Sequence, residues 1–311
     1  MSLRAIRLAW VIALIGLAVA PIAAATNGET KVIQLASVHA VIGDIETGEI
    51  LYTKRDALPV PIASLTKLMT AVVVLDGGQS LDESIPVVKF SGPTEKNCFS
   101  RLRVGSSSPR GQLLRVALMS SDNLAAWTLA QHYTGGLEAF TAAMNAKAEA
   151  LGMTNTHYSD PTGLSLENRS SASDLWKLLR AAYGYETIRA YSTTTSYTAK
   201  LHQPNYTLGY WNTNPLISSG RWQIGLSKTG YLDEAGRCLL MVADIDGRKV
   251  GIVLLNSFGT RTPQGDASRV RRWLESESVT PVAGAAADYE RRVAKVYDAA
   301  VAASKPGAQA H

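Results

Sequence analysis

The chain has 311 residues, 46% of them hydrophobic, which is enough for one large core or two domains and excludes wholesale disorder. Its formal net charge is +5, but Arg4 and Arg7 lie in a leader without acidic residues, so the remaining chain is nearer +3. A charge this small, without a basic stripe interleaved with aromatic residues, gives no reason to expect a nucleic-acid partner.

The N-terminus has the three parts of a secretory signal. Two arginines supply the charged part, residues 8–20 form an uncharged apolar run, and residues 23–25 are small alanines that suit cleavage before Thr26. An uncleaved membrane anchor is the alternative, and Pro21 with the small residues favours cleavage. No cysteine lies near the cut for lipid attachment. We therefore expect an exported protein without a stable membrane anchor.

Cys98 and Cys238 are too few cysteines for a disulfide framework. Cys238 lies in an apolar strand pattern, so we interpret it as a small buried residue, and a bond to Cys98 is the less favoured alternative. The histidines have no ligand spacing, and neither His-Glu-x-x-His nor Cys-x-x-Cys occurs. The sequence therefore predicts no metal site.

The first half of the chain predicts a hairpin followed by helices. Residues 32–43 and 50–53 have strand patterns about a turn. A helix with apolar residues at helical spacing begins at Ser64 and ends before Gly77. Residues 79–108 are expected to be loops with short strands, and further helices are expected at about 109–119, 123–133 and 137–150.

The second half predicts a turn, a capped helix and a β-meander. Residues 160–163 form the turn, and Ser171, three residues before Asp174, caps a helix that ends near Tyr183. Residues 193–211 have an extended, polar pattern. Strands are expected at 223–228, 238–245 and 250–256, followed by a helix at about 267–274.

An alanine-rich tail occupies residues 279–311. It lacks a strong apolar face, although residues 285–303 have the composition of a loose helix. A solvated tail is therefore favoured over a helix that lies on a membrane.

The order of hairpin, helix, helical block, meander and helix predicts one antiparallel sheet made from both ends of the chain. Helices are expected to flank this sheet, with a mostly helical lobe inserted between the two ends. The fold class is then α/β of the α+β type. The expected organisation is a signal peptide at 1–25, one catalytic domain at 26–278 and the tail at 279–311.

Ser64 and Lys67 are the first candidate catalytic residues. Three residues apart on a helix, they share one face, with about 5–6 Å between their β-carbons. Ser64 stands at the helix start, where free N–H groups favour a developing anion. A lysine can activate a hydroxyl only if burial or a nearby cation, such as Lys228, lowers its pKa. Taken alone, the pair is better explained by a helix cap and a surface lysine.

Ser121-Asp122-Asn123 lies on a tight connection between two helical patterns. The hydroxyl of Ser121 can relay a proton between the lysine and a leaving amine, and the amide of Asn123 can hold both the lysine and a substrate carbonyl. Taken alone, this motif is better explained by an ordinary helix cap.

Lys228-Thr229-Gly230 follows a strand pattern and is expected at the end of that strand. A cation and a hydroxyl there can bind a substrate carboxylate, and Gly230 leaves room for a peptide along the strand. The backbone N–H groups of Tyr231 and Ser64 can form an oxyanion hole. An ordinary hairpin end would explain the motif alone. The three motifs together indicate acyl transfer through a serine whose base is a lysine.

These three motifs are known together from class A β-lactamases and penicillin-binding proteins. Over roughly residues 33–278 the chain resembles the low-molecular-mass D-alanyl-D-alanine peptidases, the penicillin-recognising family S11. Residues 61–70, 117–123 and 160–164 carry this resemblance, and residues 143–148 and 266–273 are similar to the endopeptidases of the family. The resemblance implies a β-lactamase/transpeptidase-like fold.

The resemblance also implies roles for the candidate residues. Ser64 would be acylated, Lys67 would be the base, and Ser121 and Asn123 would complete the relay. Lys228, Thr229 and Gly230 would bind substrate. The implied enzyme is a periplasmic endopeptidase that hydrolyses D-alanyl-diaminopimelate (4→3) cross-links in peptidoglycan, with β-lactam antibiotics as covalent ligands and without a cofactor.

Three other functions compete with this one. A carboxypeptidase that trims terminal D-alanine from pentapeptide stems has the same motifs and stays open; the related membrane-attached carboxypeptidases continue into a β-domain and an anchor not recognisable here. A class A β-lactamase is disfavoured, because its Glu-x-x-Leu-Asn motif is not matched at Glu167, which Asn168 follows. A non-catalytic wall-binding protein is disfavoured by the intact motifs.

Overall fold

The computed structural model of the protein describes residues 32–92 and 98–304. The signal peptide expected at 1–25 lies outside these residues. Within them, no helix is both long and apolar enough to cross a membrane.

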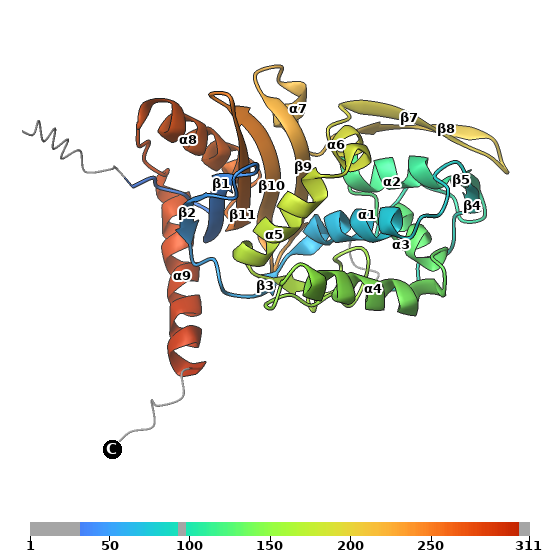
Figure 1. The fold of residues 1–311 in the computed structure, drawn as a ribbon, viewed down its shortest axis with the longest axis horizontal. Coiled ribbons are helices and arrows are strands. Elements are labelled where there is room, and N and C mark those ends of the chain that lie inside the picture. Colours follow the sequence, from blue (N-terminus) through green and yellow to red (C-terminus); the bar gives the residue numbers. More distant parts are fainter. Residues whose placement is uncertain (1–31, 93–97, 305–311) are drawn as a thin grey trace, which may run out of the picture. The chain divides into compact units, whose positions relative to one another are not determined.

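A five-stranded antiparallel sheet in the order β2-β1-β11-β10-β9 is built from both ends of the chain (Figure 1). His39 of β1 pairs with Leu255 of β11, so the N-terminal hairpin adds directly to the C-terminal meander. This confirms the predicted hairpin, meander and sheet, although the first strand begins at residue 39 rather than 32. The strands are β1 His39–Asp44, β2 Ile50–Lys54, β9 Gln223–Leu232, β10 Gly236–Ile245 and β11 Arg248–Ser257.

Helices flank this sheet on two faces. Helix α5, Ala172–Tyr183, packs on β1, β10 and β11, and α8, Thr262–Ser276, packs on β10 and β11. Side chains alternate along β10, so Leu240 belongs to the core on the α5 side and Leu239 to the core on the α8 side. The sheet is therefore buried on both faces, and it forms a rigid support for the residues on its edge strand β9.

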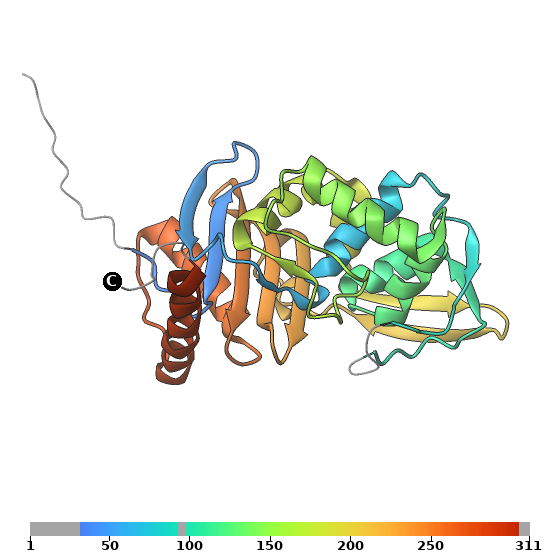
Figure 2. The ribbon, with the colours of Figure 1, turned by 90° about the horizontal axis from the view of Figure 1, so that it is seen from below.

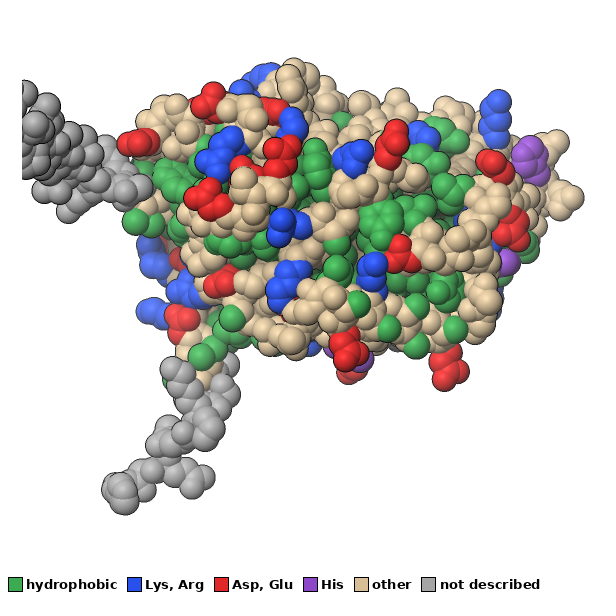
Figure 3. Space-filling view, in the orientation of Figure 1, with side chains coloured by type: hydrophobic (Ala, Val, Ile, Leu, Met, Phe, Trp, Pro, Cys, Tyr) green, Lys and Arg blue, Asp and Glu red, His purple; other side chains and the backbone are tan. Residues whose placement is uncertain are grey.

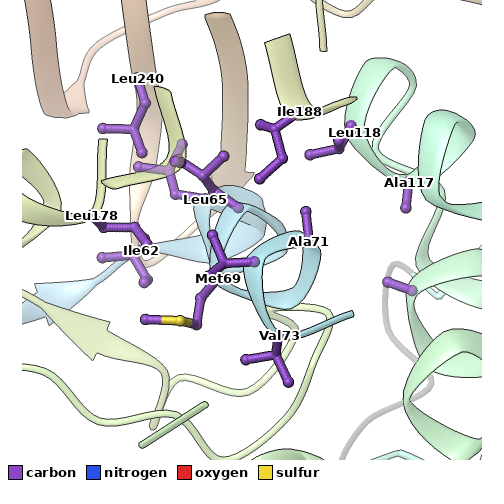
Figure 4. Packing of buried hydrophobic residues seen from close by; sticks show 14 of the residues in the cluster. Ile62, Leu65, Met69, Ala71, Val73, Ala117, Leu118, Leu178, Ile188 and Leu240 are labelled. Carbon is purple, nitrogen blue, oxygen red and sulfur yellow. The ribbon is translucent and has the colours of Figure 1, made fainter. Parts of the chain in front are cut away.

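A mostly helical lobe lies beside the sheet (Figure 2). Its central helix, α1 Thr66–Asp76, is buried from Thr66 to Val74 and contacts each of the four helices α2 to α5. Figure 4 shows Leu65 and Met69 packed among side chains that include Ile188 and Leu240. The other helices of the lobe are α2 Arg110–Met119, α3 Asn123–Gln131, α4 Gly136–Ala150 and α6 Glu186–Ser192.

Three short ribbons and a short helix complete the fold. Strand β3, Val60–Pro61, pairs with β6, Arg169–Ser170, and β4, Ser84–Pro86, pairs with β5, Ser107–Pro109. The polar segment at 193–211 is a hairpin of β7, Ser196–Leu201, and β8, Tyr206–Trp211. Helix α7 is Pro215–Ser218. Neither α6 nor α7 was predicted, because both are too short for an apolar period to show.

The C-terminal segment forms α9, Gly284–Ser304. One face of this helix packs against the N-terminal hairpin of β1 and β2. Arg55 donates to Glu290 over 3.0 Å and to Asp298 over 3.1 Å, and the Tyr297 ring meets the edge of His39 at 4.9 Å between centroids. The loose helix expected at 285–303 is confirmed as α9, while the expectation of a solvated tail is wrong at the face that docks. The docked face is made of tyrosines and acids that complement Arg55, a pattern that apolar periodicity does not detect.

Cys98 and Cys238 are both free thiols, and Cys238 is buried, which confirms its interpretation as a small core residue. Charged side chains of both signs are interspersed over the face of the molecule seen in Figure 3. That face therefore presents no continuous basic surface.

Candidate active site

Ser64 lies in a 3₁₀ turn, Ala63–Leu65, that leads into α1. Two glycines let neighbouring backbones approach this turn. A Cβ on Gly163 would lie 2.0 Å from the Ala63 carbonyl oxygen, and a Cβ on Gly230 would lie 3.3 Å from the Ser64 nitrogen. The serine is therefore held between the loop after Asp160 and the edge strand β9.

Lys67 donates three hydrogen bonds at the centre of the site. Its Nζ atom lies 3.0 Å from Ser64 Oγ, 2.6 Å from Asn123 Oδ1 and 2.7 Å from the Thr162 carbonyl oxygen. The side chain is 1% exposed. Burial lowers the pKa of Lys67 to about 7, although Asp160 and Asp122 act in the opposite direction. Charged and neutral forms are then comparable near pH 7, so the amine can accept a proton from Ser64.

Ser121 and Asn123 enter the site from the connection between α2 and α3. The backbone at Ser121 is left-handed, with φ +59°. Asp122 caps α3, because its Oδ1 atom accepts a hydrogen bond of 2.9 Å from the Ala125 N–H, and Ser100 donates to the same carboxylate. The Ser121-Asp122-Asn123 motif is therefore both a helix cap and a source of catalytic side chains. The cap belongs to Asp122, and it places its two neighbours toward Lys67 and Lys228.

Lys228 lies within β9, which continues to Leu232, so the predicted strand end at this motif is wrong. The polar residues of the motif interrupt the apolar pattern by which a strand is predicted. Lys228 is nevertheless buried and pairs with Leu240 of β10. Its Nζ atom donates to Ser121 Oγ over 2.9 Å and to the Thr229 carbonyl oxygen over 2.8 Å. Burial, with a smaller contribution from Lys67, holds the pKa of Lys228 well below its usual value.

Thr162 is a partner of the catalytic lysine that its sequence motif does not predict. Asp160 accepts hydrogen bonds from the N–H groups of Thr162 and Gly163, over 2.6 Å and 2.9 Å. Asn168 accepts from the Asp160 N–H and donates to Thr66 Oγ1, each over 3.1 Å. This buried network holds the Thr162 carbonyl against Lys67. The Asp-Pro-Thr-Gly sequence predicts a turn and contributes to the family resemblance, but nothing in it assigns the Thr162 carbonyl a place at the lysine.

A pocket of about 630 Å³ opens above Ser64. Arg237 and Arg261, two cations outside the three sequence motifs, also line it. The predicted residues Ser64, Ser121, Asn123, Thr229, Gly230 and Tyr231 all line this pocket, and the buried Lys67 and Lys228 contact members of that set. Among residues 32–92 and 98–304, no cluster of three or more His, Cys, Asp or Glu side chains is arranged to hold a metal ion.

A serine hydroxyl held by a buried lysine of lowered pKa, at the edge of an antiparallel sheet, defines a serine hydrolase of the lysine-base type. The family model for peptidase S11, described as D-alanyl-D-alanine carboxypeptidase, matches residues 24–259. The chain belongs to this family of serine-type D-Ala-D-Ala peptidases.

Curated relatives include enzymes of two kinds. The D-alanyl-D-alanine endopeptidase of Pseudomonas aeruginosa is 50% identical over 256 residues, which cover 82% of this chain and 83% of that protein. The D-alanyl-D-alanine endopeptidase of Escherichia coli K12 is 46% identical over 277 residues, which cover 89% of each chain. The D-alanyl-D-alanine carboxypeptidase of Streptomyces sp. K15 is 32% identical over 254 residues, covering 77% of this chain and 87% of that protein.

Solved structures share the fold. The crystal structure of the Streptomyces K15 DD-transpeptidase matches with a TM-score of 0.72 and 30% identity, covering 77% of this chain and 97% of that one. Penicillin-binding protein D2 of Listeria monocytogenes, in its cefotaxime-bound form, matches with a TM-score of 0.67 and 26% identity over the same shares. The sheet and inserted helical lobe described above are thus the transpeptidase-like fold that the sequence predicted.

Proposed function

We propose that this chain is a periplasmic D,D-endopeptidase that hydrolyses D-alanyl-diaminopimelate (4→3) cross-links of peptidoglycan through an acyl-enzyme on Ser64. The observation that carries the proposal is the 3.0 Å hydrogen bond between Ser64 Oγ and Lys67 Nζ, whose pKa is lowered to about 7. Identities of 50% and 46% to two endopeptidases, against 32% to a carboxypeptidase, support the endopeptidase assignment. The leader with its small-residue cleavage site supports export.

In the first step Ser64 Oγ attacks the D-alanyl carbonyl carbon while Lys67 Nζ takes the hydroxyl proton. The backbone N–H groups of Ser64 and Tyr231 stabilise the oxyanion. The close approach of Gly230 to the Ser64 nitrogen supports this pairing, because it brings β9 beside the nucleophile. The Asn123 amide, bonded to Lys67 through its oxygen, holds the base in place.

In the second step the C–N bond breaks and the leaving amine takes a proton through Ser121. Lys228 supports this relay, because its Nζ atom donates to Ser121 Oγ over 2.9 Å. Lys228 and Thr229 hold the carboxylate beside the scissile bond, which a terminal D-alanine and the diaminopimelate centre both possess. Water then hydrolyses the ester and releases Ser64.

β-Lactams are expected to acylate Ser64 and to leave it slowly. The cefotaxime-bound state of the Listeria relative supports the first part. For the second, Glu167 lines a different pocket from Ser64, so it is not placed as the deacylating glutamate of a β-lactamase. Rapid turnover of a chromogenic β-lactam would contradict this expectation.

The decisive experiment incubates purified protein with cross-linked muropeptide dimers and, separately, with monomeric pentapeptide. Cleavage of the dimers into monomers supports the endopeptidase. Cleavage of pentapeptide alone would leave the carboxypeptidase as the function. A Ser64→Ala variant is the matched control, and it should lose both activities together with covalent labelling by fluorescent penicillin.

A further inference from the structure

Trp211 presents an open aromatic surface at the end of β8. Its side chain is 67% exposed, although tryptophan is usually well buried. The indole lies back along its own strand, because a Cβ on Gly209 would lie 3.2 Å from indole Cη2. The absence of a side chain at Gly209 lets the ring lie there. Gly209 and Trp211 pair across the hairpin with Thr198 and Ser196, which are small and exposed. Neither of these side chains covers the indole ring.

The backbone of Trp211 is bonded to the segment that carries Ser121. Ser120 Oγ donates to the Trp211 carbonyl oxygen over 2.6 Å, and the Thr213 N–H donates to the Met119 carbonyl oxygen over 2.9 Å. Thr213 itself lines the catalytic pocket, where its hydroxyl lies 2.6 Å from that of Thr229. The chain at Trp211 is therefore joined to the segment of Ser121, and Thr213, two residues further on, lines the pocket.

Arg101 adds a cation at β8, next to the two residues that precede Trp211. Its guanidinium donates to the Gly209 carbonyl oxygen and stacks on Tyr210, with 4.9 Å to the ring centroid. The Tyr210 hydroxyl in turn lies 3.4 Å from the capping carboxylate of Asp122. Arg101 is exposed, so its remaining N–H groups are accessible to a carboxylate.

We propose that Trp211 and Arg101 form a subsite for the peptide strand that a cross-linked substrate releases as its amine. This inference rests on the proposed function, in which Ser121 delivers the proton to the leaving amine. The released strand must then extend from Ser121 toward the surface to which Ser120 and Thr213 connect Trp211. Its aliphatic stem can cover the indole, and its carboxylates can pair with Arg101.

This subsite distinguishes the two substrates that the catalytic motifs cannot distinguish. In a pentapeptide the group that leaves is a single D-alanine, which ends inside the pocket. In a cross-linked dimer the leaving group is a whole peptide, which must continue beyond the pocket rim. Binding energy from Trp211 is therefore available to the dimer alone, and it raises kcat/KM for that substrate only.

The test compares the wild type with Trp211→Ala, measuring kcat/KM on cross-linked dimers and on pentapeptide. We expect the dimer value to fall about tenfold, the scale of one well-placed aromatic contact, and the pentapeptide value to change less than twofold. Trp211→Phe should recover most of the dimer activity. Arg101→Gln should lower the dimer value in the same selective way.

Thr207→Ala is the matched control, because Thr207 lies on the same exposed face at the other end of the hairpin. It should leave both activities unchanged. The rate of acylation by penicillin reports whether each variant has kept its site. An equal effect of Trp211→Ala on both substrates, or no effect on dimers, would overturn the subsite. Failure of the wild type to cleave dimers would instead overturn the proposed function.

Discussion

Gly163 and Ala63 touch through their backbones, so closely that a Cβ on Gly163 would lie 2.0 Å from the Ala63 carbonyl oxygen. The contact joins the turn that carries Ser64 to the loop that carries the Thr162 carbonyl. Since Lys67 bonds to both sides, over 3.0 Å to Ser64 and 2.7 Å to Thr162, this approach sets the geometry of the base.

Gly163→Ala should therefore damage both stability and acylation. The residue has φ +81°, and the new methyl group would collide with rigid backbone, so we expect a loss of about 2–4 kcal/mol in the free energy of unfolding. Urea unfolding measures the loss, and fluorescent penicillin measures the slowed acylation. Gly247→Ala is the control, because Gly247 has φ +75° and a methyl group there would meet nothing within 4 Å. Equal losses in the two variants would show that the Ala63 contact is unimportant.

Lys67→Met should remove the base while keeping the volume of the side chain. We expect acylation of Ser64 by penicillin to slow by about 10²- to 10⁴-fold, the usual contribution of a positioned proton acceptor. Stopped-flow acylation is the measurement, with circular dichroism to verify the fold. Lys147→Met, which removes a surface ion pair with Asp76, should acylate at the wild-type rate. A Lys67→Met protein that acylates normally would assign the base to another group.

The rate of acylation should rise with pH and reach half of its maximum near pH 7. Lys67 must be neutral to accept the proton, and burial lowers its pKa from 10.5 to about 7. Residual acylation by Lys67→Met should not show this step. A wild-type profile without a step between pH 6 and 8 would contradict a lysine base of lowered pKa.

The same lowered pKa predicts how stability depends on pH. Between pH 7 and 10.5 the unfolded chain carries a proton on Lys67 that the folded chain has lost. Because the unfolded state binds more protons, the contribution of this group to stability increases as pH rises through that window. Lys228, whose pKa is also lowered, acts in the same direction. Urea unfolding at several pH values measures the increase, which Lys67→Met should reduce.

Two tyrosines of α9 should stabilise the sheet through Asn256. This residue has φ +53°, and it lies where the pairing of β10 with β11 shifts register. Tyr289 donates to Asn256 Oδ1 over 2.7 Å, and Asn256 Nδ2 donates to Tyr297 over 3.3 Å. We expect Tyr289→Phe to cost about 1 kcal/mol of unfolding free energy. In an Asn256→Gly background the same change should cost almost nothing. Equal costs in both backgrounds would exclude this coupling.

Local sequence was sufficient for most of the fold. Ser171 Oγ accepts from the Asp174 N–H as a cap should, and the predicted helices at 109–119 and 137–150 match α2 and α4 within one residue at each end. These features depend on spacing, capping and turn chemistry, which neighbouring residues determine. Local pattern failed where a strand contained a polar motif, as at Lys228, or where a helix docked through tyrosines and acids, as at α9.

The sequence by itself determined the residue types, their order and the shared helix face of Ser64 and Lys67, and from these the chemistry of a serine nucleophile with a lysine base. Only the tertiary structure decided that Lys67 is buried with three acceptors, that the Thr162 carbonyl is one of them, and that Lys228 contacts Ser121. The physical reason is that a lysine becomes a base through desolvation, which depends on segments far away in the chain. The exposed indole of Trp211 belongs with these features, because the exposure of a side chain is a property of the folded surface.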